Sequence, residues 1–281
     1  MTAKAALACL LVFVCGTAAR AQSARVTTDI LFRVLMVKTA FDYGTMFSIE
    51  VDHREYWITA KHLLTGAKAG PGTLKSAKFS ASVLDAISPE PKWVPVEFTV
   101  LDPGKDIDIV VLVPPQPIQQ VPIPPLPVAS VGVPIGGECE FLGFPFALAL
   151  PSKYEGLNYR MPVIKHCYIS GTVPEPIRTF VLDGLNNVGF SGGPVIAQTG
   201  TAQVIFGVIS GFISEPSDVI SVPETLPPQG QKPTSVESAP NKSEKRKNVV
   251  NLNSGIVFAT DATYALEAIK KNPIGPVVQN K

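Results

Sequence analysis

A serine surrounded by glycines is the stretch of this sequence best suited to covalent chemistry. In NNVGFSGGPV, residues 186–195, Ser191 lies among three glycines and is followed closely by a proline. Glycine lets the backbone adopt positive φ or approach another group closely, so this serine is expected on a tight, exposed turn. A hydroxyl held in that way becomes a nucleophile when a neighbouring base takes its proton. The stretch therefore predicts a nucleophilic serine at position 191.

The order of the histidines along the chain limits which base can serve Ser191. GFSGG also fits Gly-x-Ser-x-Gly, the nucleophile elbow of α/β-hydrolases, in which the histidine follows the serine. Here all three histidines, His53, His62 and His166, precede the serine, which argues against that class. Two familiar orders leave the serine last. One fits His62, Asp108 and Ser191, and the other fits Asp108, His166 and Ser191.

The stretches around His62 and Asp108 favour the first order. His62 follows the strand-like run YWITA in a short turn, and Asp108 opens an apolar run that would shield its carboxylate from water. The second order belongs to an α/β fold with helices that this chain lacks. Asp106, the nearest rival for the carboxylate role, is interpreted as a solvated turn residue. His53 is interpreted as turn surface and His166 as a structural residue.

The elements that must position these residues are mainly β-strands. Short runs rich in Val, Ile, Phe and Thr, separated by turn residues, fill residues 25–113 and resume at residue 138. Between them, PPQPIQQVPIPPLPVAS places a proline at nearly every second or third position. Proline lacks a backbone donor and favours extended chain, so residues 114–130 are expected to connect two halves of the protein.

Helical character is confined to the run TDATYALEAIKK near the C-terminus. Thr260 or Asp261 is a plausible helix cap there, and four residues fall near one face: Tyr264, Ala265, Ala268 and Ile269. Residues 214–248 are polar and proline-rich and end in a charged run. They predict a flexible surface loop without chemistry.

The first 21 residues have the pattern of a secretory signal peptide. Lys4 precedes an apolar run from Ala5 to Val14, and small residues near Ala21 suit a cleavage site. The apolar run is too short for a stable membrane anchor, which needs about 20 residues. We therefore expect a secreted or periplasmic protein. Removal of residues 1–21 leaves 22 basic and 23 acidic residues, a balance that does not favour nucleic acid as a partner.

Taken together, the motifs resemble those of trypsin-like serine proteases, particularly the bacterial HtrA-like branch, without a PDZ domain. The matching stretches are TAKH at 59–62, DIVVL at 108–112, GFP at 143–145, GFSGGPV at 189–195, GVISG at 207–211 and GIVFA at 255–259. The resemblance implies an all-β fold of two antiparallel β-barrels with a short C-terminal helix. Residues 22–113 would form the first barrel, residues 131–281 the second, and the active site would lie between them.

The resemblance also implies a role for each candidate residue. His62 would be the general base and later the general acid, Asp108 would hold its tautomer, and Ser191 would attack a peptide carbonyl. The backbone N–H groups of Gly189 and Ser191 would form the oxyanion hole. No cofactor or metal ion is implied, and the substrates would be polypeptides.

Four further residues are expected by resemblance to contact the substrate. Leu185 would lie near the base of the primary pocket, while Ser210, Gly211 and Phe212 would form its wall and pair with the substrate backbone. Because no acid occupies position 185, a preference for Lys or Arg is not supported. Two other readings stay open: a catalytically inactive binding module on the same fold, and an esterase that uses the same triad.

Two features outside the triad are also interpreted by resemblance. The trypsin branch has an aspartate before the nucleophile that pairs with a newly cut N-terminus, but here that residue is Phe190, which is expected to pack against the second barrel. Activation by N-terminal clipping is therefore not expected. Cys139 and Cys167 would form a disulfide in an oxidising compartment, the alternative being two buried free thiols.

Overall fold

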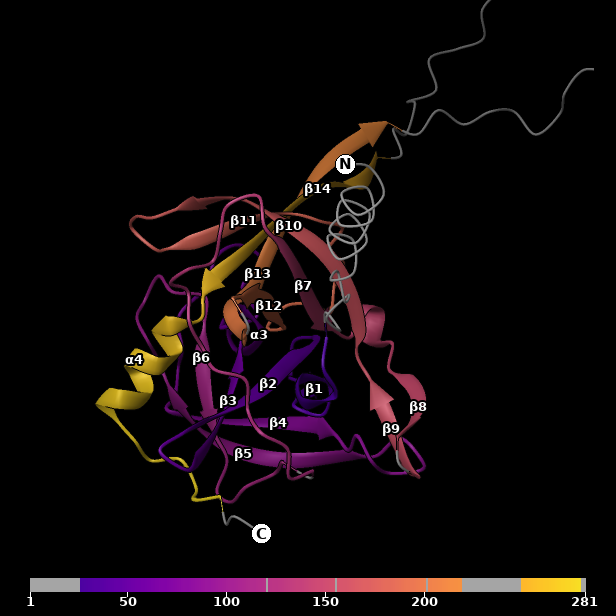
Figure 1. Cartoon of the computed structure of the whole chain (residues 1–281), viewed down its shortest axis with the longest axis vertical. Coiled ribbons are helices and arrows are strands. Elements are labelled where there is room, and N and C mark those ends of the chain that lie inside the picture. The colour runs from indigo at the N-terminus through magenta and orange to yellow at the C-terminus, as the bar shows by residue number, and fades with distance from the viewer. Residues whose placement is uncertain (1–25, 120, 155, 201, 219–248, 279–281) are drawn as a thin grey trace, which may run out of the picture.

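Two closed antiparallel β-barrels, each of six strands, make up the body of the protein. The structure is a computed structural model that describes residues 26–119, 121–154, 156–200, 202–218 and 249–278 (Figure 1). The predicted all-β fold of two barrels with a short C-terminal helix is confirmed. The predicted signal peptide, residues 1–21, and most of the predicted loop, residues 219–248, lie outside the described residues.

The first barrel closes in the strand order β1–β2–β3–β6–β5–β4, so that each strand is paired on both sides. A short helix, α2 (Thr28–Leu31), precedes it, so the expectation that helical character is confined to the C-terminal run was wrong. Its interior is filled by large apolar side chains such as Trp57, Phe98 and Leu112, all of them fully buried. The strands are β1 (Val34–Lys38), β2 (Tyr43–Val51), β3 (Arg54–Thr59), β4 (Lys78–Leu84), β5 (Trp93–Leu101) and β6 (Val110–Val113).

The second barrel closes in the order β10–β11–β14–β13–β12–β7 and has a separate interior around Phe141, Phe180 and Phe206. β13 and β14 are the longest strands, and their pairing runs as far as Asp218 and Val249. Strand pairing therefore covers the first residues of the segment predicted as a loop. The strands are β7 (Glu138–Gly143), β10 (Val163–Val173), β11 (Thr179–Asp183), β12 (Pro194–Thr199), β13 (Ala202–Asp218) and β14 (Val249–Asp261).

The predicted C-terminal helix, α4 (Thr263–Lys271), lies beside the first barrel (Figure 1). Ala265 and Ile269 on its predicted apolar face are buried in a hydrophobic cluster that also contains residues of both barrels. At the start of the helix, the Asp261 carboxylate accepts a hydrogen bond from the Thr263 N–H (2.8 Å). The bond satisfies one of the free N–H groups of the first turn. The N-cap residue itself is Ala262, which makes no side-chain cap, so the expectation of Thr260 or Asp261 at that position was wrong. The helix therefore follows β14, the last strand of the second barrel, and packs against the outside of the first barrel.

The proline-rich connector is held on the first barrel by a buried carboxylate. Glu55 is fully buried and accepts hydrogen bonds from the backbone N–H groups of Ile118 (2.8 Å) and Gln119 (3.1 Å), and from the Trp57 indole (2.7 Å). A buried carboxylate needs such partners to offset its lost hydration. Further along, the connector pairs with β13 of the second barrel at Val128.

A two-stranded hairpin that the sequence analysis did not predict extends from the second barrel onto the first. It consists of β8 (Leu150–Tyr154) and β9 (Leu157–Met161) and follows the 3-10 turn η1 (Pro145–Ala147). The Tyr159 hydroxyl donates to the Leu31 carbonyl, and burial raises the pKa of this hydroxyl. The Arg160 N–H donates to the Ala86 carbonyl (2.8 Å). The hairpin thus adds a second contact between the two halves.

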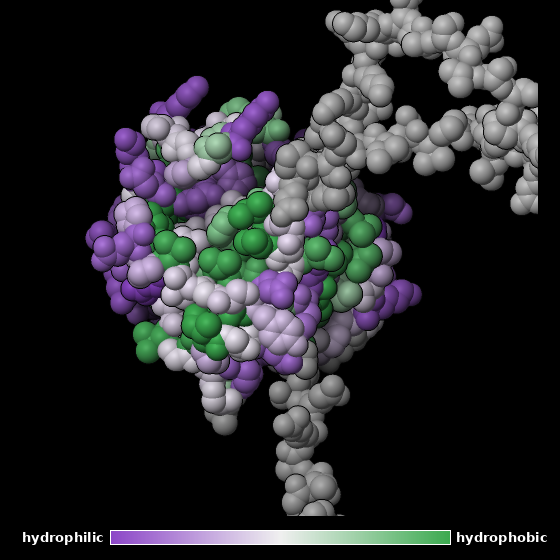
Figure 2. Space-filling view, turned by 90° about the horizontal axis from the view of Figure 1, so that it is seen from above, coloured by the Kyte–Doolittle hydropathy of each residue, from purple (hydrophilic) through white to green (hydrophobic). Residues whose placement is uncertain are grey.

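The surface of the protein carries apolar as well as polar side chains. Figure 2 shows hydrophobic residues gathered in the middle of one face, with hydrophilic residues projecting around them. None of the helices in the described ranges has the length and apolar character needed to cross a membrane.

Cys139 and Cys167 form the predicted disulfide inside the second barrel. The two residues are direct register partners on β7 and β10, with Cα atoms 4.9 Å apart. Both side chains are buried in the cluster that fills the barrel. The bridge therefore fixes the strand pair that begins the second barrel.

Removing this disulfide should destabilise the protein by about 3–4 kcal/mol, because the bridge closes a loop of sequence separation 28 and restricts the unfolded chain. The test is urea unfolding, without reductant, of the wild type and of a Cys139→Ala, Cys167→Ala double variant. Two free thiols in the wild type, or equal midpoints and slopes for the two proteins, would contradict the prediction.

Candidate active site

His62 and Asp108 form a close pair at the edge of the first barrel. His62 begins α3 (His62–Thr65), just after β3 ends, and Asp108 lies just before β6. The His62 Nδ1 atom lies 2.7 Å from Asp108 Oδ2, and the His62 backbone N–H donates to Asp108 Oδ1 (2.9 Å). Both carboxylate oxygens therefore orient one histidine. A proton on Nδ1 leaves Nε2 able to accept another proton.

A buried lysine supports this pair from the adjacent position. Lys61 is fully buried, and its ammonium lies 2.6 Å from the Asp102 carboxylate. It also donates to the Gly104 carbonyl. These contacts tie the turn that carries His62 to the segment that leads into Asp108. A buried ammonium needs such partners, because an unpaired buried charge is costly.

Ser191 occupies a turn whose glycines cannot be replaced without backbone movement. Gly189 and Gly192 adopt φ values of +105° and +83°. A Cβ on Gly189 would lie 2.3 Å from the Phe144 carbonyl oxygen, and one on Gly192 would lie 2.2 Å from the Thr45 carbonyl oxygen. These contacts are too close for any side chain. The sequence pattern is therefore explained by positive φ and by close backbone packing.

Thr45 on β2 joins the serine turn to the first barrel. Its N–H donates to the Ser191 carbonyl (2.9 Å), and its hydroxyl donates to the Gly189 carbonyl (2.7 Å). The same hydroxyl accepts the Phe144 N–H (3.2 Å), and the Thr45 carbonyl accepts the Thr59 hydroxyl (2.6 Å). Thr59 lies three residues before His62. The serine turn and the strand that leads to His62 therefore meet at one buried threonine.

The two N–H groups predicted to form an oxyanion hole have no competing acceptor. Among the described residues, neither the Gly189 nor the Ser191 N–H donates to a protein atom. The neighbouring groups are engaged: Phe190 N–H donates to Asn187 O (3.2 Å) and Gly192 N–H to Ile209 O (2.8 Å). Two unpaired backbone donors on either side of a fixed turn are suited to bind an anionic oxygen.

Phe190 packs into the second barrel, as predicted. It is fully buried, and its ring meets the Phe141 ring edge to face at a centroid distance of 4.9 Å. The Phe190 side chain lies in the hydrophobic cluster of the second barrel, and it therefore anchors the backbone immediately before Ser191.

The residues expected to contact substrate lie on two segments beside the serine turn. Leu185 is 59% exposed, which suits contact with a ligand. Ser210, Gly211 and Phe212 are partly buried on β13, next to Ile209, whose carbonyl holds Gly192. β13 therefore lies next to the serine turn. The roles of Leu185 and of residues 210–212 in substrate binding stay predictions.

The rival histidines are directed to other groups. His53 lies at an exposed hairpin turn with φ +59°. His166 on β10 faces Glu140, with 3.5 Å between Nδ1 and Oε1, and its ring packs edge-on against Tyr168. Asp106 is exposed. The alternative order of Asp108, His166 and Ser191 therefore lacks the required pairing of Asp108 with His166.

Comparison with protein-family models shows the family of the chain. The family model for the trypsin-like peptidase domain matches residues 44–205, more than half of the chain. The chain belongs to the trypsin-like peptidase family. It is a serine-type endopeptidase, and membership of the family implies polypeptide substrates.

Solved structures with the same fold include HtrA-type proteases. The HtrA-type protease AlgW, solved with a tripeptide, is 16% identical with a TM-score of 0.51, and the match covers 87% of this chain and 61% of that chain. This chain therefore spans less than two thirds of AlgW. Rv3671c from M. tuberculosis H37Rv, in an inactive form, is 17% identical with a TM-score of 0.48 and is covered over 90% of its length, with 88% of this chain matched. Comparison with curated protein sequences gave no match.

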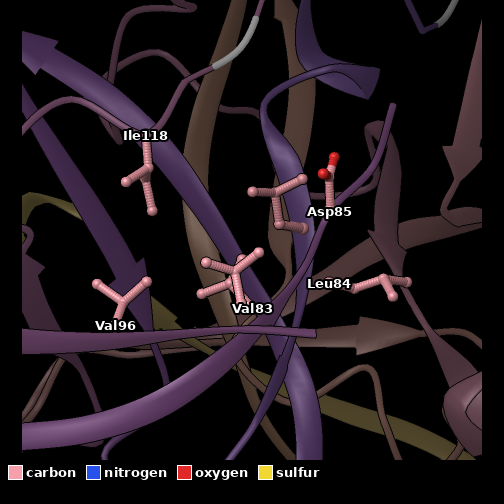
Figure 3. Close-up of a pocket in the computed structure, with 7 residues that line it drawn as sticks. Val83, Leu84, Asp85, Val96 and Ile118 are labelled. Atoms are coloured by element: carbon pink, nitrogen blue, oxygen red, sulfur yellow. The ribbon is translucent and has the colours of Figure 1, made fainter. Parts of the chain in front are cut away.

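Two cavities of this peptidase differ in their relation to the predicted site. One of about 180 Å³ lies in the first barrel, where Figure 3 shows Val83, Val96 and Ile118 around it and the Asp85 carboxylate to one side. None of the predicted site residues lines it. A more open cavity of about 370 Å³ is lined by Leu185, together with Lys165, His166, Tyr168, Asp183 and Gly184.

Sequence reasoning did not single out three residues with contacts around the candidate site: Thr45, Lys61 and Lys165, whose ammonium donates to the Leu185 carbonyl (2.7 Å). Only Lys61 had a local signal: it is a lysine within the largely apolar run around TAKHLL, and a lysine in such a run is buried only when it is paired. The partners of Thr45 and Lys165 lie far along the chain, so no local pattern indicated them.

Replacing Thr45 by Val should lower the free energy of unfolding by about 1–3 kcal/mol, because it leaves the Gly189 carbonyl and the Phe144 N–H without the hydroxyl that bonds both. Thr45→Ser keeps the hydroxyl and is the matched control. Urea unfolding compares the two variants with the wild type. If Thr45→Val is as stable as Thr45→Ser, the hydroxyl does not have this role.

Proposed function

We propose that this peptidase hydrolyses peptide bonds with Ser191 as nucleophile, His62 as general base and Asp108 as the carboxylate that orients His62. The observation that carries the proposal is the double contact of Asp108 with His62, through the ring at 2.7 Å and the backbone at 2.9 Å. It supplies a histidine of fixed tautomer beside the segment to which the serine turn is anchored. In a constellation that activates a serine hydroxyl, the base takes the hydroxyl proton. No hydrogen bond joins Ser191 to His62 among the described residues, so the contact between nucleophile and base is part of the proposal and forms when substrate is bound.

In the proposed first step, the Ser191 hydroxyl oxygen attacks the carbonyl carbon of the scissile peptide bond while its proton passes to His62 Nε2. The negative oxygen that forms is stabilised by the N–H groups of Gly189 and Ser191, which have no other protein acceptor among the described residues. Loss of one such donor costs about 3 kcal/mol in related chemistry. Asp108 stabilises the charged imidazole throughout this step.

In the proposed second step, the tetrahedral intermediate collapses. The C–N bond breaks, His62 gives its proton to the leaving amine, and an acyl-enzyme ester on Ser191 remains. Water then attacks this ester, with His62 as base again, and releases the carboxylic acid and the serine. No cofactor is required at any step.

For substrate binding, we propose that Ser210, Gly211 and Phe212 on β13 pair with the substrate backbone and that Leu185 contacts the side chain before the cleaved bond. Extended peptides commonly bind by adding a strand to an accessible sheet edge. The exposed Leu185 favours an apolar residue at that subsite.

For location, we propose secretion or export to the periplasm, with cleavage near Ala21. The charged residue, apolar run and small residues of the first 21 positions support this. We propose that the protein has no stable membrane anchor and no nucleic-acid partner, in keeping with its near-neutral charge.

Replacing Ser191 by Ala should reduce peptide hydrolysis by a factor of the order of 10⁵–10⁶, because the nucleophile is lost. Folding should be unchanged, since the partly buried side chain makes no hydrogen bond within the described residues. Turnover of a peptide substrate and thermal unfolding measure the two effects. Substantial activity in a purified variant would contradict the assignment.

Two measurements on the wild type test the alternative functions. Failure of a fluorophosphonate probe to label Ser191 would favour an inactive binding module. Cleavage of simple esters but not of peptides would favour an esterase.

Replacing His62 by Ala should remove activity, whereas His166→Ala should retain most of it, because Asp108 contacts His62 and not His166. The two variants are matched in the side chain that is removed. Steady-state kinetics on one peptide substrate compare them. Comparable losses in both would support the order of Asp108, His166 and Ser191 instead.

A further inference from the structure

A lysine of the second barrel wall contacts the segment that leads to the nucleophile at three points. The Lys165 ammonium, from β10, donates to the Leu185 carbonyl (2.7 Å) and to the Asn187 side-chain oxygen (2.9 Å). It also lies 5.6 Å from the centroid of the Phe190 ring, within the range of a cation–π contact. All three partners fall within residues 185–190, immediately before Ser191.

The contacted segment has no regular secondary structure between β11 and β12, so its shape depends on contacts with other elements. Its other anchors are uncharged: Asn253 donates to the Asn186 carbonyl, and Phe146 N–H donates to the Val188 carbonyl (2.8 Å). Within the described part of the chain, Lys165 is the one charged side chain that hydrogen-bonds to residues 184–190. Bonds from a charged donor are about twice as strong as neutral ones.

The backbone at Lys165 is held rigidly by its neighbours on β7 and β10. Lys165 pairs in register with Phe141 on β7, and Phe141 packs against Phe190. Two residues further along β10, Cys167 is covalently bonded to Cys139 on β7. The ammonium is therefore presented from a fixed wall, and it can restrain a segment that has no strand pairing of its own.

We propose that Lys165 is a positioning residue for catalysis: its ammonium holds residues 185–190 so that the Gly189 and Ser191 N–H groups point at the developing oxyanion. The proposal rests on the proposed function of Ser191. Among the described residues, Lys165 makes no hydrogen bond to His62, Asp108 or Ser191. It acts through the Leu185 carbonyl and the Asn187 amide, while Thr45 holds the same segment through the Gly189 carbonyl.

Because Lys165 acts through its positive charge, the proposal predicts that kcat depends on pH. Burial lowers the pKa of Lys165, because desolvation disfavours the charged amine. The ammonium is present below that pKa and is lost as the pH rises through it. The titratable groups around it are His166 and Tyr168 on β10, Asp183 on β11 and Glu140 on β7. In the wild type, kcat should therefore fall at alkaline pH.

The test compares Lys165→Met and Lys165→Arg in the full chain, with Lys153→Met as a control because Lys153 is exposed on β8. Lys165→Met should increase amide hydrogen exchange in peptides that cover residues 184–191 about tenfold, with other segments unchanged. It should lower kcat for a peptide substrate about tenfold or more, with a smaller effect on KM. Lys165→Arg keeps a charged donor, so it should restore kcat and move the alkaline fall to higher pH.

Each outcome decides the proposal. Unchanged exchange over residues 184–191 in Lys165→Met, or unchanged kcat in an active enzyme, would overturn it. An equal loss in Lys153→Met would show a general effect of removing a lysine, and would overturn it as well. If the wild type cleaves no peptide, the proposed function fails, while the exchange measurement still decides whether Lys165 holds the segment.

Discussion

Thr45 makes three hydrogen bonds to the second half of the protein and accepts a fourth from Thr59 within the first barrel, and the geometry of the candidate site depends on them. Its backbone N–H and its hydroxyl hold the turn of Ser191, while its carbonyl is bonded by Thr59 on the strand that leads to His62. All of these groups are buried, so a lost partner would be left unsatisfied and would cost more than the bond itself contributes. Thr45 therefore ties the segment of Ser191 to the strand that precedes His62, and it does so alongside the connector, the β8–β9 hairpin and α4, which also bridge the two barrels.

Close backbone packing around this junction explains the glycines of the sequence. Gly192 leaves no room for a Cβ against the Thr45 carbonyl, and Gly189 leaves none against the Phe144 carbonyl. The turn is tight because carbonyl groups of both barrels lie directly against it. On either side, polar side chains act at a distance from the chemistry: Lys61 secures the segment before Asp108, and Lys165 contacts the segment before Ser191. Lys165 on β10 and Lys61 at the start of α3 thus support the loops that carry the candidate residues.

Local patterns were sufficient for the parts of the molecule whose stability depends on neighbours along the chain. Alternating β-branched and aromatic residues predicted the strands, and the apolar face of residues 263–271 predicted the helix. The pairing of Cys139 with Cys167 followed from resemblance and is present in the barrel wall. The hairpin of β8 and β9 was not predicted, because all its residues except Tyr159 are only partly buried or exposed and they show no clear alternation. It is stabilised by contacts with the first barrel at Leu31 and Ala86.

The sequence by itself determined the family, the two-barrel fold and the identities of His62, Asp108 and Ser191 as candidates. A glycine-rich turn and the alternation of apolar residues in a strand both depend on residues that are close in sequence, so the sequence alone predicts them. Only the tertiary structure decided which histidine faces Asp108 and which polar residues hold the site. Thr45 and Gly189 are 144 residues apart, and Lys61 reaches across 43 residues to Gly104. Such contacts depend on strand register and on the packing of one barrel against the other, and neither has a signature at the residues concerned.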